Sequence, residues 1–356
     1  SVWVQRGGGG GGANNRVRVC GSQVAASETG YFTMKPTKAA AITKAATGIF
    51  DIAMGTASMS AAQIPLLLRA ALVSGIRHFD MAEMYGNQEW IGQYFKEVWS
   101  TGGLAGVGLS LQRSDIFLTS KIWCTNLAPE HVRASLELTL RDLQIDYLDQ
   151  WLIHWPVALA HTGVTGPAQG AWMPVDEMSG QAVFARGYSL CDAWAEMERA
   201  HADGLVRSLG VSNFPPALLH QIIGCAKTVR PSVNQVEAHP YFSQDVLLRY
   251  CRANNVTLQA YSPLAAGAAG GTSDLLREPA LVAAALAHGR TPAHVALRWN
   301  VQRGVSVVTQ SSRPERIAGV ISGVLGFALA PEEMAAIDAV AERGKFVIPD
   351  AFRFLL

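Results

Sequence analysis

The chain has 356 residues, of which 49% are hydrophobic and 16% are charged, so it can bury one large core or two ordinary ones. Its formal net charge of +1 provides neither a basic field for nucleic acid nor an acidic field for cations, and a small neutral or anionic ligand is the expected partner. No apolar run approaches the roughly 18 residues that a membrane span needs, so no membrane partner is expected.

The cysteines are odd in number and scattered, and none forms a C-x-x-C pair. They are Cys20, Cys124, Cys191, Cys225 and Cys251. This spacing indicates neither a disulfide framework nor a zinc site, and no metal is expected. It favours reducing surroundings, and we expect a cytoplasmic protein.

Residues 1–40 differ in composition from the rest of the chain. Gly7 to Gly12 is an unbroken glycine run, and Glu28 is the only acid before Asp51. Such a segment packs poorly and predicts a low-complexity, disordered tail. A basic, Ser- and Ala-containing segment is also similar to an organelle transit peptide, and both interpretations stay open.

From residue 48 onward, short apolar runs alternate with segments of helical periodicity. The runs predict strands over 48–54, 76–80, 116–120, 147–153, 206–211, 233–237, 257–261 and 305–309. The segments between and after them predict helices over 64–74, 88–98, 129–143, 189–202, 216–225, 244–254, 279–288, 292–302 and 331–341.

Eight successive β/α units connect by right-handed crossovers and close into a barrel. No G-x-G-x-x-G follows the first strand, which argues against a doubly wound dinucleotide-binding sheet. We therefore predict a single (β/α)8 TIM barrel domain over residues 41–356. The irregular segments 156–188 and 265–272 follow the fourth and seventh strands and are candidate lids.

Ionisable residues end several of the predicted strands, where a parallel barrel places its active site. Asp80, Lys121 and His154 end the second, third and fourth strands, and Tyr85 follows Asp80 by five residues. A carboxylate keeps a neighbouring ammonium charged, and the ammonium is expected to lower the pKa of the phenol. Tyr85 could then donate a proton while His154 orients a carbonyl oxygen, a form of catalysis that contributes about 10² to 10⁴ in rate.

Six segments at the predicted strand ends share a wider pattern. They read GIRHFDMAEMYGN over 75–87, SKIWCT over 120–125, LIHWP over 152–156, GVSNF over 210–214, NQVEAHP over 234–240 and AYSPL over 260–264. Together they resemble the signature segments of the aldo-keto reductase family, over roughly residues 41–345. The resemblance implies a monomeric (β/α)8 barrel without a Rossmann domain, which binds a nicotinamide dinucleotide across its C-terminal face and reduces small aldehydes or ketones.

The same resemblance implies roles for the residues of the reacting centre. Tyr85 would be the proton donor, Lys121 and Asp80 would tune it, and His154 would align the substrate carbonyl. Trp123 and Trp155 match aromatic residues of the substrate pocket wall. A short hairpin across the N-terminal end of the barrel would fall at 42–49.

Cofactor-binding positions are implied in the same way. They are Ser212, Asn213 and Gln235 for the nicotinamide carboxamide, Tyr261 for stacking on its ring, Ser262 and Leu264 just after Tyr261, and Gln310, Ser311 and Arg316 toward the 2′-phosphate. NADPH is the expected cofactor, with NADH possible.

The chain departs from the family pattern near the 2′-phosphate. Gln310 stands where a lysine is usual, and Gly319 and Val320 replace a Glu-Asn pair, although Arg313 could restore the lost charge. Ala57 stands where a pocket tryptophan is expected. These changes weaken the case for tight NADPH binding and widen the predicted pocket.

Each site residue has an ordinary alternative when it is taken alone. Asp80 and Lys121 could form a structural ion pair, and His154 could be a core histidine. A nicotinamide-binding barrel with a regulatory or structural role and little turnover is the competing function. The joint presence of all four residues favours the enzyme, because a binding module needs no proton donor. We assign Arg77, His78, Glu237 and His239 to structure.

Overall fold

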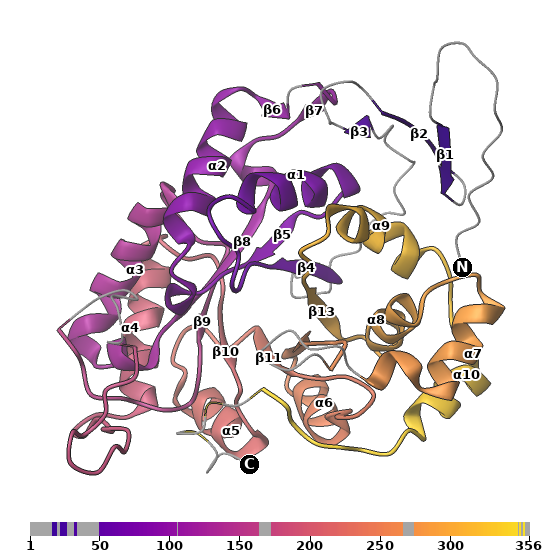
Figure 1. Cartoon of the computed structure of the whole chain (residues 1–356). Coiled ribbons are helices and arrows are strands. Elements are labelled where there is room, and N and C mark those ends of the chain that lie inside the picture. The colour runs from indigo at the N-terminus through magenta and orange to yellow at the C-terminus, as the bar shows by residue number, and fades with distance from the viewer. Residues whose placement is uncertain are drawn as a thin grey trace.

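The computed structural model describes residues 16–19, 22–26, 32–33, 50–104, 106–163, 172–265, 274–347, 349 and 352 (Figure 1). Eight strands form a closed barrel in which every neighbouring pair is parallel, and β13 pairs with β4 to complete the circle. They are β4 (Ile52–Gly55), β5 (His78–Asp80), β8 (Phe117–Ile122), β9 (Gln150–Ile153), β10 (Leu209–Ser212), β11 (Val233–Glu237), β12 (Thr257–Tyr261) and β13 (Ser306–Thr309). The predicted barrel is confirmed.

Helices surround these strands, as Figure 1 shows. They are α1 (Ile64–Ser74), α2 (Gln88–Ser100), α3 (Pro129–Leu143), α4 (Leu190–Ala202), α5 (Pro216–Cys225), α6 (Asp245–Ala253), α7 (Pro279–Ala287), α8 (Pro292–Gln302), α9 (Pro314–Leu325) and α10 (Pro331–Asp338). Many begin with proline in the first turn, where the missing N–H has no helical partner in any case. Their apolar stripes face the strands, and in α1 the stripe includes Leu67, Leu68, Ala71 and Leu72.

Short elements complete the described part of the chain. They are β6 (Gly103–Leu104) and β7 (Leu109–Ser110), which form a hairpin, and the 3-10 turns η1 (Glu83–Tyr85), η2 (Arg113–Asp115), η3 (Cys124–Asn126) and η4 (Asp274–Arg277). The turn η1 matters for the site, because it carries Tyr85 directly beyond the end of β5.

Several predicted strands begin later than expected, and one helix was not predicted. The runs from 147 and 206 meet first at an isolated bridge between Leu148 and Val206, and the regular ladder between β9 and β10 starts at Trp151 and Leu209. Helix α9 carries glycines that lower helix propensity. One of them, Gly323, lets α9 approach α8 closely, since an added Cβ would lie 2.5 Å from the His294 ring.

Rows of hydrogen-bonded polar side chains cross the inside of the barrel. His78 Nε2 lies 2.8 Å from Thr119 Oγ1, and Thr119 Oγ1 lies 3.3 Å from Gln150 Oε1. A second polar row joins β11, β12 and β13. Large apolar side chains, Trp151, Trp194 and Trp299 among them, are fully buried elsewhere in the core.

The predicted tail over residues 1–40 is described only at three strands. These are β1 (Arg16–Val19), β2 (Ser22–Ala26) and β3 (Phe32–Thr33), which pair into an antiparallel sheet separate from the barrel sheet. The remainder of this segment and the predicted hairpin at 42–49 lie outside the described residues.

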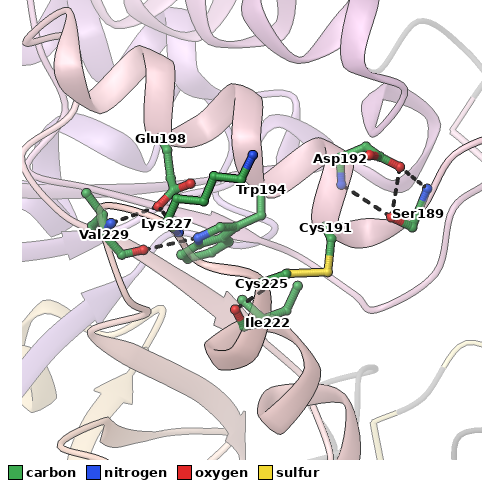
Figure 2. Close-up of a disulfide and its surroundings, with 9 residues drawn as sticks. All are labelled: Ser189, Cys191, Asp192, Trp194, Glu198, Ile222, Cys225, Lys227 and Val229. Carbon is green, nitrogen blue, oxygen red and sulfur yellow. Dashed lines mark hydrogen bonds between the residues drawn. A yellow bond between two sulfur atoms is a disulfide. The ribbon is translucent and has the colours of Figure 1, made fainter.

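A disulfide joins α4 to α5, and the expectation of no disulfide is therefore wrong. It links Cys191 in the first turn of α4 with Cys225 at the end of α5, residues that stand 34 apart in sequence but 5.9 Å apart between Cα atoms (Figure 2). Sequence spacing hides this pair because the packing of two helices creates it. Cys124 and Cys251 are free and buried.

Hydrogen bonds also connect α4 to the loop that follows α5. Glu198 on α4 accepts the backbone N–H groups of Lys227 and Val229, and Trp194 Nε1 donates to Val229 O (Figure 2). Glu198 also accepts the backbone N–H of Thr228. These contacts fix the loop after α5 against α4.

Within the described ranges, none of the helices combines the length and hydropathy that a bilayer crossing requires. Those ranges also hold no group of three or more His, Cys, Asp or Glu side chains that could bind a metal ion.

Candidate active site

Lys121 forms the centre of a buried cluster at the C-terminal ends of β5 and β8. Its Nζ lies 2.6 Å from Asp80 Oδ1, 2.8 Å from Met81 O and 3.3 Å from Tyr85 OH. The Lys121 side chain is fully buried, and Asp80 is nearly so. Lys121 thus joins one hydrogen-bonded group with Asp80, Met81 and Tyr85, which precede it by 36 to 41 positions.

Electrostatics within this cluster agree with one expectation and correct another. Burial lowers the pKa of Lys121, but Asp80 and Tyr85 outweigh burial and the net pKa is raised, so the ammonium stays charged. Burial raises the pKa of Tyr85 by more than Lys121 lowers it. The expected lowering of the Tyr85 pKa is therefore wrong, because the phenol lies in the same dry surroundings as its partner. A neutral phenol next to a fixed cation still holds a transferable proton at pH 7.

His154 lies beside this cluster, one residue beyond β9. Burial and, to a lesser extent, the Lys121 charge hold the pKa of His154 well below its usual value, so the imidazole is neutral. Its ring meets those of Tyr85 and Trp123 edge-on, with centroids 5.9 and 5.2 Å away. A neutral imidazole offers one N–H donor to a polar ligand atom without adding a second charge.

Glu83 anchors the turn that carries Tyr85. Its carboxylate accepts hydrogen bonds from Trp123 N at 2.9 Å, Asn126 Nδ2 at 2.5 Å and Ser135 Oγ at 3.0 Å. Burial raises the pKa of Glu83, although these three donors oppose the shift. The role of Glu83 was not predicted, and its one signal in the sequence is an acidic residue two positions before Tyr85.

A second polar group lies where β10, β11 and β12 end. Asn213 has a left-handed backbone, with φ of 65°, and its Nδ2 donates to His154 O and to Ser212 Oγ, each at 3.1 Å. Asn213 Oδ1 accepts from Tyr261 OH at 2.7 Å and from Lys345 Nζ at 3.0 Å. The predicted carboxamide-binding residues thus lie together, and Lys345 is an addition that the sequence did not indicate.

Glu237 holds the C-terminal segment, residues 345–347, over this group. It accepts the backbone N–H groups of Phe346 at 2.9 Å and Val347 at 2.7 Å, and His239 Nε2 lies 3.0 Å from it. The segment brings Lys345 Nζ to 4.5 Å from the centre of the Trp155 ring. Burial lowers the pKa of Lys345 to about 8. Glu237 and His239 have the structural role expected of them.

Comparison of the sequence with protein families identifies the family to which the chain belongs. The model of the Aldo/keto reductase family matches residues 46–342, which is most of the chain. The chain belongs to the aldo-keto reductase family. Among similar curated proteins, Aldo-keto reductase family 1 member A1 of Bos taurus is 37% identical over 308 residues, covering 84% of this chain and 88% of that protein. Aldo-keto reductase family 1 member C21 of Mus musculus is 38% identical over 293 residues, covering 81% and 85%.

Solved structures agree with the family assignment. Aldose reductase from Schistosoma japonicum has a TM-score of 0.74 at 33% identity, covering 88% of this chain and 94% of its own. Aldose reductase from Giardia lamblia has the same TM-score and identity, covering 83% and 94%. The chain is therefore related to enzymes that reduce carbonyl compounds, and it shares their barrel fold.

In this aldo-keto reductase the predicted pocket aromatics form an apolar wall above His154. Trp123 and Trp155 are almost fully buried, and Phe352, beyond the C-terminal segment, packs on Trp155 with ring centroids 5.4 Å apart. Trp123 Nε1 donates to Trp172 O at 2.5 Å. Phe352 and Trp172 were not predicted, because segment ends and loops show no periodicity that would place them.

The residues predicted near the 2′-phosphate follow β13. Gln310 is exposed, and its amide donates to Ala57 O, so it faces the segment after β4. Ser311 Oγ accepts from Arg313 N at 3.1 Å, and both Arg313 and Arg316 are exposed at the start of α9. Ser262 and Leu264, just beyond β12, are partly exposed. These residues and the residues predicted to bind the carboxamide lie at the same, C-terminal end of the barrel strands.

Proposed function

We propose that this protein reduces aldehydes or ketones to alcohols with NADPH, in preference to NADH, and that Tyr85 is the proton donor. The observation that carries the proposal is the contact of Tyr85 OH with Lys121 Nζ, in a buried cluster completed by Asp80 and flanked by a neutral His154. A charged lysine held against a protonated phenol suits a group that must give up a proton and stabilise the resulting phenolate.

The side chains divide the work of the reaction. The Tyr85 hydroxyl gives its proton to the carbonyl oxygen as that oxygen gains negative charge, and Lys121 stabilises the phenolate that remains. His154 donates an N–H to the same oxygen and aligns it. NADPH, when bound, would supply the hydride for the new C–H bond of the alcohol. Asp80 keeps Lys121 charged in its dry setting.

The residues present fit a nicotinamide carboxamide. Gln235 donates both of its N–H groups to protein atoms, and its Oε1 accepts no hydrogen bond from the described part of the chain. An acceptor left open suits the N–H₂ of a carboxamide. Ser212 and Asn213 lie beside it, and Tyr261 is partly exposed for ring stacking. These residues would hold the cofactor.

Cofactor preference rests on the residues that begin α9. Arg313 and Arg316 are exposed there, and a guanidinium binds a phosphate through two parallel hydrogen bonds. Because Gln310 contributes no charge, we expect a smaller preference for NADPH than a lysine at that position would give. The apolar wall of Trp123, Trp155 and Phe352 supports aromatic or other apolar carbonyl substrates.

Replacing Tyr85 by phenylalanine tests the proposal. We expect Tyr85→Phe to bind NADPH with nearly the wild-type Kd and to lose at least about 100-fold in kcat for an aromatic aldehyde, because only the transferable proton is removed. Turnover is followed by the disappearance of NADPH absorbance. Tyr94→Phe is the matched control, since Tyr94 OH is buried without a hydrogen-bond partner among the described residues, and it should keep wild-type turnover.

Two results would count against the proposal. Near wild-type turnover of Tyr85→Phe would show that another group donates the proton. NADPH binding by wild type without turnover of any aldehyde or ketone in a broad panel would favour the alternative, a nicotinamide-binding barrel with a regulatory or structural role.

A further inference from the structure

A row of polar side chains crosses the barrel interior from the active site to β13. Gln235 Nε2 donates to Asp80 Oδ2 at 2.6 Å and to Gln259 Oε1 at 2.8 Å, and Gln259 Nε2 donates to Ser306 Oγ at 3.1 Å. Ser306 Oγ in turn donates to Phe50 O at 2.7 Å. Gln259 faces Gln235 and Ser306 in the pairing of β11, β12 and β13, so the three side chains lie at one level of the barrel.

The direction of every hydrogen bond in this row is fixed by its two ends. The Asp80 carboxylate, paired with Lys121, only accepts, and the Phe50 carbonyl only accepts. The Ser306 hydroxyl must therefore donate to Phe50 O and accept from Gln259. Turning either glutamine amide around would set oxygen against oxygen or N–H against N–H, which is costly because Gln235 and Gln259 are both buried.

The consequence falls on Gln235, which has two N–H groups and one oxygen to offer. Asp80 takes one N–H, and Gln259 takes the other. Only Oε1 remains, and it accepts no hydrogen bond from any residue that the structure describes. With Asp80 as its only partner, Gln235 could turn its second N–H toward a ligand. Because Gln259 accepts that N–H, Gln235 can offer a ligand only its oxygen.

We propose that Gln259 is a positioning residue that locks the Gln235 amide with its oxygen toward the cofactor site, so that the site selects a dinucleotide whose pyridine ring carries an N–H donor. Gln259 touches no ligand in this scheme and acts through Gln235. The inference rests on the proposed function, because it takes Gln235 as a carboxamide-binding residue. It adds a preference for an N–H donor on the pyridine ring, and this preference arises from the register of the barrel strands and the direction of the hydrogen bonds.

The test compares two ligands that differ in one group. NADP⁺ carries a carboxamide, whereas its 3-acetylpyridine analogue has a methyl group in place of the N–H₂. Kd values are measured by isothermal titration calorimetry on the full-length chain. Wild type should bind the analogue about 5- to 100-fold more weakly, because Gln235 Oε1 loses its donor and keeps no partner.

Two variants assign the effect to Gln259. Gln259→Met has a similar length but no acceptor, so the second Gln235 N–H is released and the ratio of the two Kd values should fall to within about threefold. Gln259→Glu is the matched control, because a neutral carboxyl group can accept from Gln235 and donate to Ser306, and it should keep the wild-type ratio. General loosening of the barrel would weaken the binding of both dinucleotides together and leave the ratio of their Kd values unchanged.

The outcomes separate this inference from the proposed function. If wild type binds NADP⁺ well but the analogue equally well, or if Gln259→Met keeps the wild-type ratio, Gln259 has no positioning role, although carbonyl reduction can stand. If wild type binds neither dinucleotide, the proposed function fails and the inference fails with it. Circular dichroism checks folding first, and Gln259→Asn, which withdraws the same acceptor by one methylene, replaces the methionine variant if that does not fold.

Discussion

At the scale of single residues, burial decides what each ionisable group does. Lys121 keeps its charge in a dry site because Asp80 contacts it at 2.6 Å, whereas Tyr85 and His154 remain neutral there. Lys345 has a weaker partner, since it contacts the neutral Asn213 amide and the Trp155 ring. Burial therefore lowers its pKa to about 8. The same dry pocket gives these lysines opposite shifts, and the nearest carboxylate makes the difference.

Lys345 should make stability rise with pH. Its folded pKa of about 8 lies below the ordinary value of 10.5, so between those pH values the unfolded chain binds more protons than the folded chain. Relative to Lys345→Met, wild type should gain about 2 kcal/mol in free energy of unfolding between pH 7.5 and pH 9.5. Urea unfolding at both pH values measures this. Lys96→Met, which removes an exposed ammonium on α2, should behave as wild type, and a Lys345→Met slope equal to both would refute the assignment.

At the scale of elements, α4 and α5 are joined by a covalent link as well as by packing. The disulfide, the Glu198 carboxylate and the Trp194 indole all tie α4 to α5 or to the loop after it. Strand β10 lies between these helices in the chain, and it ends at Ser212, next to Asn213. The connections therefore brace the unit that carries part of the candidate cofactor site.

Removing the disulfide should destabilise the barrel measurably. A cross-link spanning 34 residues restricts the unfolded chain, and the chain-entropy model gives about 3 to 4 kcal/mol for such a loop. We expect the double variant Cys191→Ser, Cys225→Ser to lose up to that amount in free energy of unfolding. Dithiothreitol should lower the Tm of wild type and leave that of the double variant unchanged. Equal Tm values for wild type with and without dithiothreitol would mean that the disulfide does not stabilise the fold.

At the scale of the whole molecule, the two ends of the chain relate differently to the barrel. Strands β1 to β3 pair only with one another, in a sheet separate from the closed barrel. Lys345 and Phe352, in contrast, lie against the site, and Glu237 accepts the backbone N–H groups of Phe346 and Val347 beside them. The C-terminal part of the chain thus contributes side chains to the candidate site, whereas β1 to β3 contribute nothing to the barrel sheet.

Deleting residues 1–40 should leave the enzyme intact. Because the barrel strands close without β1 to β3, the truncated chain should keep wild-type kcat, KM and urea midpoint. Deleting residues 345–356 is the contrasting variant, and it should raise KM for an aromatic aldehyde, since Phe352 leaves the pocket wall. An unfolded or inactive barrel after the first deletion would contradict this prediction.

The sequence by itself determined the barrel and the four residues that cluster at the C-terminal ends of its strands. Alternating apolar runs and helical periodicity predicted all eight strands, since that pattern is local, and Asp80, Tyr85, Lys121 and His154 follow because parallel strands end at one face. Helices α1, α3, α5 and α8 match their predicted bounds for the same reason.

The tertiary structure decided what depends on contacts between distant segments. The direction of the Tyr85 pKa shift follows from burial, and burial is a property of the assembled barrel. The Cys191–Cys225 disulfide, the Glu83 anchor and the row through Gln259 each join residues more than 20 positions apart. No local pattern encodes such distances, because they arise only when strand register and helix packing bring the side chains together.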